Sequence, residues 1–330
     1  MENNENNDLN FDNRVPLEEL RGTVEQIKKE LSTIIVGQKD FIELLIISIL
    51  ADGHALIEGV PGIAKTVTAK LFAKTLKTEF SRIQFTPDLM PSDILGTSVF
   101  NTKTTEFEFK KGPIFSNIIL IDEINRAPAK TQAALFETME ERQATVDGTT
   151  YKMGQPFMVL ATQNPIEQEG TYRLPEAQLD RFLFKINVNY PSLEEEIRIL
   201  ESKHEQKTKI EEELINSLLS GQQIADYQKI IKEIIVEKNL LKYIASIVDN
   251  TRTNANLYLG ASPRASIAIM DASKALAAIR GRDFITPDDI KKVAGPVLGH
   301  RIMLTPEREM EGLTSEQVVN QIVDSIEIPR

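Results

Sequence analysis

The stretch His54–Thr66, HALIEGVPGIAKT, decides the fold of this chain. An apolar run of strand length ends at Glu58, a turn containing two glycines follows, and a helical pattern begins directly after it. Glycines in such a turn let backbone N–H groups converge on phosphate oxygens, and the positive end of the next helix adds to the attraction. In this context Lys65 reaches the terminal phosphates and the Thr66 hydroxyl binds Mg²⁺. The stretch therefore predicts a phosphate-binding loop, the alternative being an ordinary turn with a solvated lysine.

One position departs from the general form of this loop. The residue before the motif lysine is usually glycine, and here it is Ala64. An alanine is acceptable there if its backbone is already right-handed helical, because its methyl group then meets no steric conflict. We therefore expect helical backbone angles at Ala64.

A second motif further along the chain supports the first. Ile118–Ile121 is an apolar run of strand length, and Asp122 and Glu123 follow it directly. In open α/β sheets, ligands bind beyond the carboxyl ends of the strands. Asp122 would hold Mg²⁺ there, and Glu123 would accept a proton from the attacking water. Two solvated acids are the alternative, but both motifs in this order predict ATP binding and hydrolysis.

The first half of the chain alternates between strand-like and helix-like segments. Five apolar runs have the length of strands: 54–58, 81–85, 118–121, 157–162 and 182–188. Helical patterns such as 64–77 and 129–141 lie between several of them. Apolar runs without alternation fit strands that are covered on both faces. This half therefore predicts an α/β fold with a parallel sheet flanked by helices.

The pattern changes after Tyr190-Pro191. Ser192–Glu195 fits a helix capping box, and Thr286-Pro287 is a second clear helix start. The helical patterns in this part are 193–203, 224–236, 240–251, 263–279, 287–293 and 315–325. We therefore predict a disordered, acidic and asparagine-rich tail at 1–12, an α/β core at 13–191, and an all-helical domain at 192–330.

Composition excludes several classes of protein. The 330 residues include 38 Lys+Arg, 49 Asp+Glu and no cysteine, and the net charge is −11. Without cysteine there is no disulfide framework, thiolate metal site or thiol nucleophile. The acidic balance argues against a protein that coats nucleic acid or anionic membranes. Phe41–Leu50 is the most apolar stretch, and it is shorter than the roughly 20 residues of a membrane span.

We therefore expect Phe41–Leu50 to form a buried helix, and we expect a cytoplasmic protein without membrane insertion. His54, His204 and His300 show no metal-binding spacing, so Mg²⁺ is the only metal predicted.

The chain resembles the MoxR family of AAA+ ATPases, which belongs to the helix-2-insert clade. The resemblance extends from the segment at 35–38 (IVGQ) to His300-Arg301. Beyond the phosphate loop it rests on the segments 85–93 (FTPDLMPSD), 122–128 (DEINRAP), 161–165 (ATQNP) and 174–182 (LPEAQLDRF). Alanine before the motif lysine is typical of this family. The resemblance implies an AAA+ core with a C-terminal helical lid, and ATP and Mg²⁺ as cofactors.

The resemblance also implies roles for residues outside the two motifs. Asn164 matches the sensor-1 position, where a polar side chain orients the attacking water. Arg181 matches the arginine finger, which acts on the ATP of a neighbouring subunit. Arg126 and Arg173 are close in sequence and are alternatives for that role. Arg264 matches the sensor-2 arginine, which contacts the γ-phosphate.

Arg264 also allows an argument from its position. The segment Ser262-Pro263 begins a helix, so Arg264 lies in a first turn, where a cation opposes the helix dipole. A nearby anion would explain this placement, although an exposed, solvent-screened arginine is the alternative. We therefore expect Arg264 to couple ATP to rotation of the helical domain.

The expected site is then complete. Residues expected to contact the nucleotide are Val36, Gly37, Gln38, Gly59, Val60, Pro61, Gly62, Ile63, Ala64, Lys65, Thr66, Asp122 and Arg264. Of these, the segment 36–38 matches the family's adenine-packing segment, and Thr66 and Asp122 are the expected metal ligands. Residues expected to take part in catalysis are Lys65, Glu123, Asn164, Arg181 and Arg264.

Two predicted hairpins point to what the energy of ATP is used for. Ser98–Phe109, with Asp88–Leu95, resembles the insertion in the second helix of this clade. Ala144–Lys152 centres on Asp147-Gly148, a strong two-residue turn signal, and matches the hairpin before sensor 1. In ring-forming relatives such hairpins face the central channel or the partner. Surface hairpins without a partner are the alternative.

Three functions fit these features. The favoured one is a chaperone-like ATPase that remodels or matures a protein client, often with a von Willebrand factor A-domain partner, and forms a ring that is hexameric with ATP. The second is a nucleic-acid-translocating motor. The basic residues of the first hairpin, Lys103 and Lys110-Lys111, are interleaved with Glu106 and Glu108, so nucleic acid is the less favoured partner. The third is an ATP-gated binding module with negligible hydrolysis.

Overall fold

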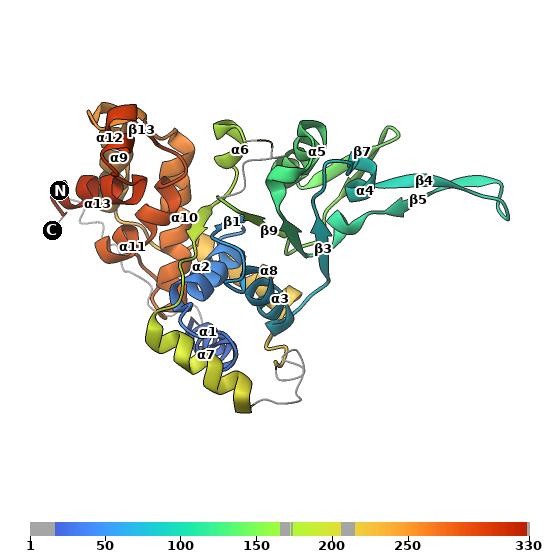
Figure 1. Cartoon of the computed structure of the whole chain (residues 1–330), viewed down its shortest axis with the longest axis horizontal. Helices are drawn as coiled ribbons and strands as arrows, with labels where there is room; N and C mark the ends of the chain where they lie inside the picture. Colours follow the sequence, from blue (N-terminus) through green and yellow to red (C-terminus); the bar gives the residue numbers. More distant parts are fainter. Residues whose placement is uncertain (1–16, 166–171, 173, 206–214, 329–330) are drawn as a thin grey trace, which may run out of the picture.

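A five-stranded parallel sheet lies at the centre of the protein, seen in a computed structural model that describes residues 17–165, 172, 174–205 and 215–328 (Figure 1). The predicted tail at 1–12 and Arg173 lie outside these residues. The order across the sheet is β10-β1-β9-β6-β3. The strands are β1 (Ala55–Glu58), β3 (Phe80–Gln84), β6 (Ile118–Asp122), β9 (Met158–Gln163) and β10 (Phe184–Asn187). Each predicted strand is confirmed to within two residues at either end.

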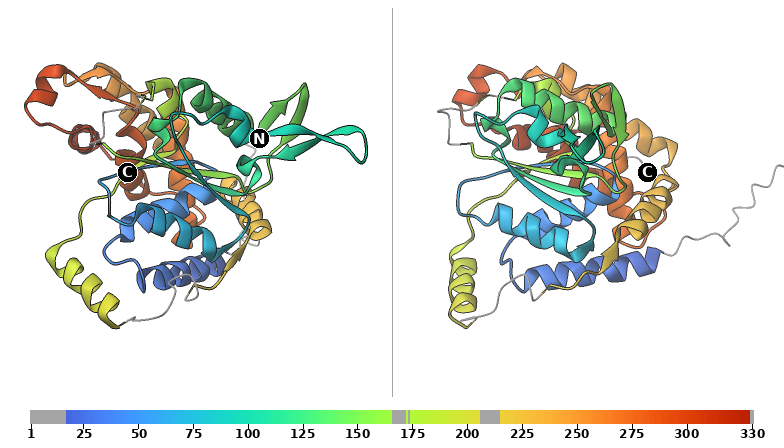
Figure 2. Two further views of the ribbon diagram at one scale, coloured as in Figure 1. Left: turned by 45° about the vertical axis from the view of Figure 1, so that its right-hand side comes forward. Right: turned by 90° about the vertical axis from the view of Figure 1, so that its right-hand side faces the viewer.

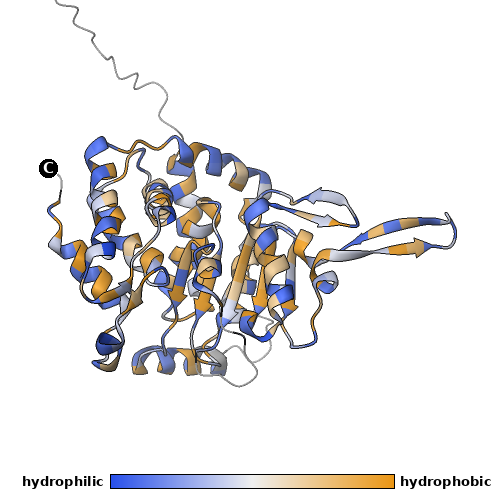
Figure 3. Ribbon diagram, turned by 90° about the horizontal axis from the view of Figure 1, so that it is seen from above, coloured by the Kyte–Doolittle hydropathy of each residue, from blue (hydrophilic) through white to orange (hydrophobic). Residues whose placement is uncertain are grey.

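The three central strands, β1, β6 and β9, are buried on both faces, which explains why they are apolar without alternation. The edge strands β3 and β10 contain exposed polar residues. Neighbouring residues of one strand enter different cores: Ile57 packs with the helices on one side, and Leu56 with those on the other. The first side is covered by α1 (Leu17–Ser32), α2 (Lys39–Leu50) and α3 (Lys65–Thr75), and the second by α5 (Ala129–Glu141). Figure 3 shows hydrophobic segments of both strands and helices in the interior.

The stretch Phe41–Leu50 forms a buried helix, as predicted, and lies within α2. Among the described residues, no helix combines the length and the apolar character that crossing a membrane requires.

The C-terminal part is built mainly from helices, and two of them begin at the predicted starts Ser192 and Thr286. Its helices are α7 (Leu193–Glu205), α8 (Gly221–Lys232), α9 (Lys238–Thr253), α10 (Pro263–Ile279), α11 (Pro287–Leu298), α12 (Pro306–Met310) and α13 (Ser315–Ser325). Ser192 and Glu195 exchange the two hydrogen bonds of a capping box. At the start of α11 the N–H and the hydroxyl of Thr286 both donate to the Asp289 carboxylate. Both predicted helix starts are therefore confirmed.

The prediction of an exclusively helical second domain needs correction, because this part also contains short strands. They are β11 (Leu219–Ser220), which pairs with β2 (Leu76–Lys77) of the core, and β12 (Leu257–Leu259), which pairs with β13 (Met303–Leu304). Two-residue strands carry too little pattern to be distinguished from loops in a sequence.

The buried helix α10 joins the two parts of the chain. It packs against α9 and α11, and also against α1 and α2 of the core. The Gln228 side chain of α8 donates a hydrogen bond to the Ile49 carbonyl at 2.7 Å. Apolar packing is therefore continuous across the predicted boundary at residue 191.

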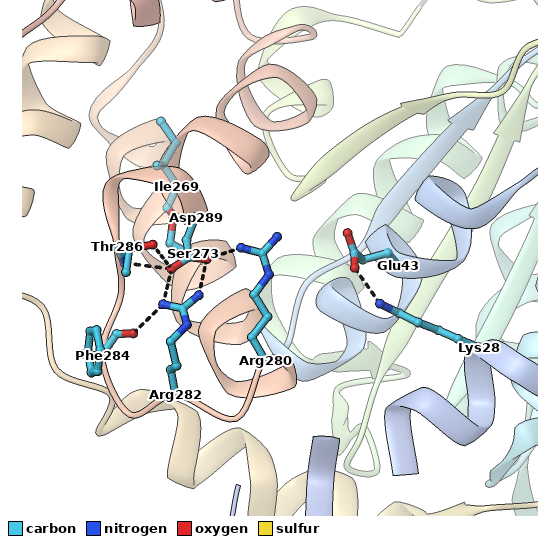
Figure 4. A network of polar contacts seen from close by, with 9 residues as sticks. All are labelled: Lys28, Glu43, Ile269, Ser273, Arg280, Arg282, Phe284, Thr286 and Asp289. Carbon is cyan, nitrogen blue, oxygen red and sulfur yellow. Dashed lines mark hydrogen bonds and ion pairs between the residues drawn. The ribbon is translucent and has the colours of Figure 1, made fainter. Parts of the chain in front are cut away.

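A buried carboxylate fixes the turn between α10 and α11 (Figure 4). Asp289 accepts hydrogen bonds from Arg280 at 2.8 Å, and from Arg282 at 2.7 and 2.8 Å. Burial alone would raise the pKa of Asp289, but the bonds from Arg282 and Thr286 bring it below its usual value. The charge is thus compensated where it is buried, as a buried carboxylate requires.

Two hairpins extend from the side of the sheet that α5 covers. The hairpin of β4 (Gly96–Asn101) and β5 (Glu106–Lys111) follows α4 (Pro91–Leu95) and projects far from the body (Figures 1 and 2). The second, of β7 (Gln143–Val146) and β8 (Thr149–Lys152), turns at Asp147-Gly148, where both residues have positive φ. This is the geometry that the turn signal predicts. Ser98 donates a hydrogen bond to Asp147 at 2.6 Å and so ties the two hairpins together.

Candidate nucleotide-binding site

The predicted phosphate loop connects β1 to α3 and has little space for side chains at its start. A Cβ at Gly59 would lie 2.6 Å from the Val188 carbonyl oxygen and 2.5 Å from Ile63 Cδ1. Gly62 has φ +84°, a conformation that glycine adopts at little cost. These two positions therefore require glycine for different reasons, close approach at the first and backbone conformation at the second.

Ala64 contradicts the expected helical backbone. Its φ is 60° and its ψ is 21°, which is the left-handed region, and α3 begins only at Lys65. The residue directly before α3 is therefore left-handed. Glycine, which usually stands at this position, adopts that conformation more easily than alanine does. An L-residue in this region costs about 1–2 kcal/mol. The loop of this protein therefore carries a local strain that the sequence pattern does not reveal.

Asp122 lies beside Thr66 at the carboxyl ends of β6 and β1. Its Oδ1 accepts hydrogen bonds from the Thr66 hydroxyl at 3.0 Å and from Thr162 at 3.3 Å. Its Oδ2 accepts from Arg82 Nε at 2.6 Å. The residues predicted to hold the metal are therefore adjacent, and the buried carboxylate is compensated by an arginine that sequence reasoning missed.

Glu123 follows with a left-handed backbone, φ 57°, and its N–H donates to the Thr162 hydroxyl at 3.0 Å. Its carboxylate accepts a hydrogen bond from Gln84 at 2.9 Å and forms an ion pair with Arg126 at 2.9 Å. Thr162 thus supports both acidic residues. A signal exists in hindsight for Thr162, a polar residue near the carboxyl end of a strand that is apolar up to that point. Arg82 and Gln84 give no such signal, because they belong to a strand with three polar residues.

Lys65 and Asn164 complete this edge of the sheet. The Lys65 ammonium group donates a hydrogen bond to the Gly59 carbonyl and lies 3.4 Å from the Gln163 carbonyl oxygen. Asn164 follows β9 directly and is buried. The side chains predicted for phosphate binding, metal binding and water activation therefore converge at the carboxyl ends of β1, β6 and β9.

The segment predicted to pack on adenine lies beside the same loop. The Gln38 amide donates to the Ile63 carbonyl at 2.8 Å and accepts from the Thr68 hydroxyl at 3.0 Å. Gly37 has φ +79°, and a Cβ there would lie within 2.5–2.7 Å of the Glu195 carboxyl group. Residues 36–38 therefore connect the phosphate loop with the beginning of α7.

Arg181 and Arg264 lie elsewhere, beside each other. Both form ion pairs with Glu140 at the end of α5, Arg264 at 2.8 Å, and Arg181 also donates to the Phe136 carbonyl at 2.9 Å. Arg181 precedes β10, which runs parallel to β1, so it lies at the amino edge of the sheet. The phosphate loop follows the carboxyl end of β1 and therefore lies at the opposite edge of the sheet. The structure thus does not bring Arg181 or Arg264 to the phosphate loop of its own chain. Arg126, in contrast, contacts Glu123 within the candidate site.

A parallel sheet with a phosphate loop after β1, acidic residues after β6 and a helical C-terminal lid defines a P-loop ATPase of the AAA class. Two family comparisons agree with this class. Residues 54–184 match the ATPase family associated with various cellular activities (AAA), and residues 249–322 match the AAA lid domain.

Individual relatives narrow the class to a family. The chain is 43% identical over 317 residues to the chaperone MoxR1 of Mycobacterium tuberculosis, covering 93% of this chain and 83% of that protein. It is 44% identical over 312 residues to the uncharacterized protein YeaC of Bacillus subtilis, covering 94% and 97%. A crystal structure of a presumed ATPase from Cytophaga hutchinsonii superposes with a TM-score of 0.87 at 42% identity, covering 95% of this chain and 97% of that one. The chain belongs to the MoxR family of AAA+ ATPases.

Proposed function

We propose that this protein binds ATP with Mg²⁺ at the carboxyl edge of its sheet, hydrolyses it, and uses the energy to remodel a protein client. The observation that carries the proposal is the contact between the Thr66 hydroxyl and the Asp122 carboxylate, 3.0 Å apart, next to the phosphate loop. Hydroxyl and carboxylate oxygens are the donors that Mg²⁺ prefers. The bound ion would supply positive charge beside the β- and γ-phosphates.

The surrounding residues then have separate tasks. Lys65 attracts the terminal phosphates, Glu123 accepts the proton of the attacking water, and Asn164 orients that water. Gln84 and Arg126 hold the Glu123 carboxylate in place.

Point variants separate binding from hydrolysis. Lys65→Ala should abolish ATP binding, whereas Glu123→Gln should bind ATP and lose turnover. Glu79→Gln is a matched control, because Glu79 is an exposed acid at the far end of β3. A wild-type protein that binds ATP without measurable turnover would contradict the proposal and identify an ATP-gated binding module.

Arg181 and Arg264 act on the ATP of a neighbouring subunit in this proposal. Both lie at the edge of the sheet opposite their own phosphate loop, and the Arg264 side chain is 58% exposed. Contacts of this head-to-tail type close into rings, and we expect a hexamer.

Mixing two inactive variants tests action between subunits. Subunits with Arg181→Ala keep an intact phosphate loop, and subunits with Lys65→Ala keep an intact arginine. Mixed rings should recover ATPase activity, because an intact loop meets an intact arginine at some interfaces. If Arg181 acted on the ATP of its own chain, mixing would restore nothing.

The projecting hairpin supports a protein client. At its end the rings of Phe100 and Phe107 lie 5.3 Å apart and are 49% and 74% exposed. The Lys111 ammonium lies over the Phe115 ring at the base of the hairpin, 5.3 Å from its centre. An exposed aromatic pair fits apolar segments of a protein, and a von Willebrand factor A-domain protein is the partner class that we propose to test first.

Capture with Glu123→Gln in ATP tests this client class. A purified A-domain protein should be retained by this variant in ATP, and the added change Phe107→Ser should reduce its retention without lowering the free energy of unfolding. Turnover that DNA stimulates, with binding that falls steeply as salt rises, would instead indicate a nucleic-acid motor.

A further inference from the structure

Arg301, just after α11, uses its whole guanidinium group to hold one short stretch of the core. The side chain is 4% exposed. Nε donates to the Asp180 carboxylate at 2.7 Å, and Nη2 donates to the carbonyls of Asp180 and Phe182 at 3.0 and 2.6 Å. Nη1 donates to the carbonyls of Leu183 and Val297 at 3.1 and 2.5 Å. A guanidinium has five N–H donors, and all five are used.

Four of these five bonds end on Asp180–Leu183, which we call the finger segment because it contains Arg181. Two more contacts come from the lid. His300 Nε2 lies 3.0 Å from the Phe182 carbonyl oxygen, and the Ser262 hydroxyl donates to the second oxygen of Asp180 at 3.2 Å. Ser262 stands at the N-cap of α10, but its side chain makes no capping bond. The lid therefore holds the finger segment from both α10 and α11.

This arrangement connects the two arginines that the proposed function assigns to the neighbouring subunit. Arg264 lies two residues after Ser262 in α10, and Arg181 lies directly after Asp180. Both arginines also reach the same carboxylate, Glu140. A displacement of the lid that left the finger segment in place would have to break six contacts around Asp180–Leu183. The finger segment and the start of α10 are thus constrained to move together.

We propose that Arg301 is a positioning residue, which holds the finger segment on the lid so that Arg181 and Arg264 reach the same neighbouring ATP as one unit. This inference rests on the proposed action of both arginines between subunits. The Arg301 side chain itself is buried within its own chain. Its effect on turnover should therefore appear at the site of the neighbouring subunit, and not at the phosphate loop of its own chain.

Arg301→Lys in the full chain is the main test, because lysine keeps the charge and loses the planar set of donors. We expect kcat to fall roughly tenfold to a hundredfold, as a misplaced catalytic group costs, with an unchanged KM and unchanged binding of a fluorescent ATP analogue. Asp180→Asn is a second, milder variant, since it keeps one side-chain oxygen as an acceptor but removes the negative charge and the second acceptor oxygen. It should lower kcat in the same direction.

Arg282→Lys is the matched control for lost stability. Arg282 is another lid arginine that binds a carboxylate with two N–H groups, and its partner, Asp289, is remote from the finger segment. We expect it to lower the unfolding temperature, as Arg301→Lys does, but to leave kcat per folded subunit within twofold of the wild type. Equal losses of kcat in both variants would show that Arg301 matters only for general stability, and would overturn the proposal.

Mixed rings give the decisive result. Subunits with Arg301→Lys, mixed with Lys65→Ala subunits, should regain activity, because the latter supply a correctly held Arg181 to intact phosphate loops. If mixtures with Arg181→Ala subunits regain activity and mixtures with Arg301→Lys subunits do not, Arg301 acts on the site of its own chain. This inference would then be wrong, while the proposed action of Arg181 between subunits would stand. If Arg181→Ala also regains nothing, the proposed action between subunits is wrong as well.

Discussion

The left-handed backbone of Ala64 leads to a stability prediction with an unusual sign. Ala64→Gly removes a Cβ from a residue whose φ is 60°. Relief of the left-handed conformation is worth about 1–2 kcal/mol. Glycine also gives the unfolded chain more conformational freedom, which lowers the free energy of unfolding by about 0.4–1 kcal/mol. Losing a half-buried methyl group lowers it by a further amount of about 0.4 kcal/mol, half the value of a fully buried one. The free energy of unfolding should therefore rise slightly, by about 0.4 kcal/mol.

A second alanine provides the control. Ala133 is exposed in the middle of α5, where the backbone is right-handed. Ala133→Gly makes the same chemical change and should lower the free energy of unfolding by about 1 kcal/mol. The two variants should thus differ by about 1.4 kcal/mol, a difference that comes mainly from the sign of φ at the two positions.

Urea unfolding without nucleotide, followed by circular dichroism, measures both variants against the wild type. The predicted order of midpoints is Ala64→Gly, wild type, Ala133→Gly, with the first two close together. A loss at Ala64→Gly as large as that at Ala133→Gly would refute the reasoning, because it would mean that the position carries no left-handed strain.

Three further outcomes follow from the contacts around the site and the core. Gly59→Ala places a Cβ 2.6 Å from a backbone oxygen just beyond β10, and should cost about 1–3 kcal/mol of stability and weaken ATP binding. Gly295→Ala in α11, with nothing within 4 Å of its Cβ, should change neither stability nor ATP binding in this way. Unfolding curves and nucleotide titrations measure both effects. Gln38→Ala removes the amide that bonds both the phosphate loop and α3, and should cost about 1–2 kcal/mol together with ATP affinity, measured in the same way. Burial lowers the pKa of His54 to about 3 and that of His300 well below its usual value. Since both histidines take up protons near pH 6.5 only when the chain unfolds, their contribution is fully present above that pH and is lost as the pH falls. Unfolding at pH 5 should therefore be easier than at pH 7, by about 2 kcal/mol for His54 and in the same direction for His300. Equal stability at the two pH values would contradict this assignment.

Much of the fold was predictable because its signals are local. The central strands β1, β6 and β9 are mainly apolar runs of four to six residues, and burial on both faces is what makes them continuous. The caps at Ser192 and Thr286 were readable for a similar reason, since each depends on hydrogen bonds across three residues. The short strand β11 was not predictable, because its partner β2 lies far away in the sequence and its two residues carry no period.

The predicted site was found only in part, for a related reason. Lys65, Thr66, Asp122 and Glu123 belong to motifs whose spacing follows from one strand and one turn, so their convergence could be expected. Arg82 supports Asp122 from a neighbouring strand, and which strand lies next to β6 is decided by the order of the sheet. The resemblance to the MoxR family named Arg181 and Arg264, but it did not indicate that both would bind Glu140.

The sequence by itself determined the parallel α/β core, the phosphate loop with its acidic partners, and the change to helices after residue 191. Tertiary structure decided the sign of φ at Ala64, because the direction of the turn from β1 to α3 depends on how α3 packs against the sheet that contains β1. It also decided that Arg301 holds Asp180 from 121 residues away. Contacts of that length arise only when separate elements pack together, and no local period or spacing in the sequence records them.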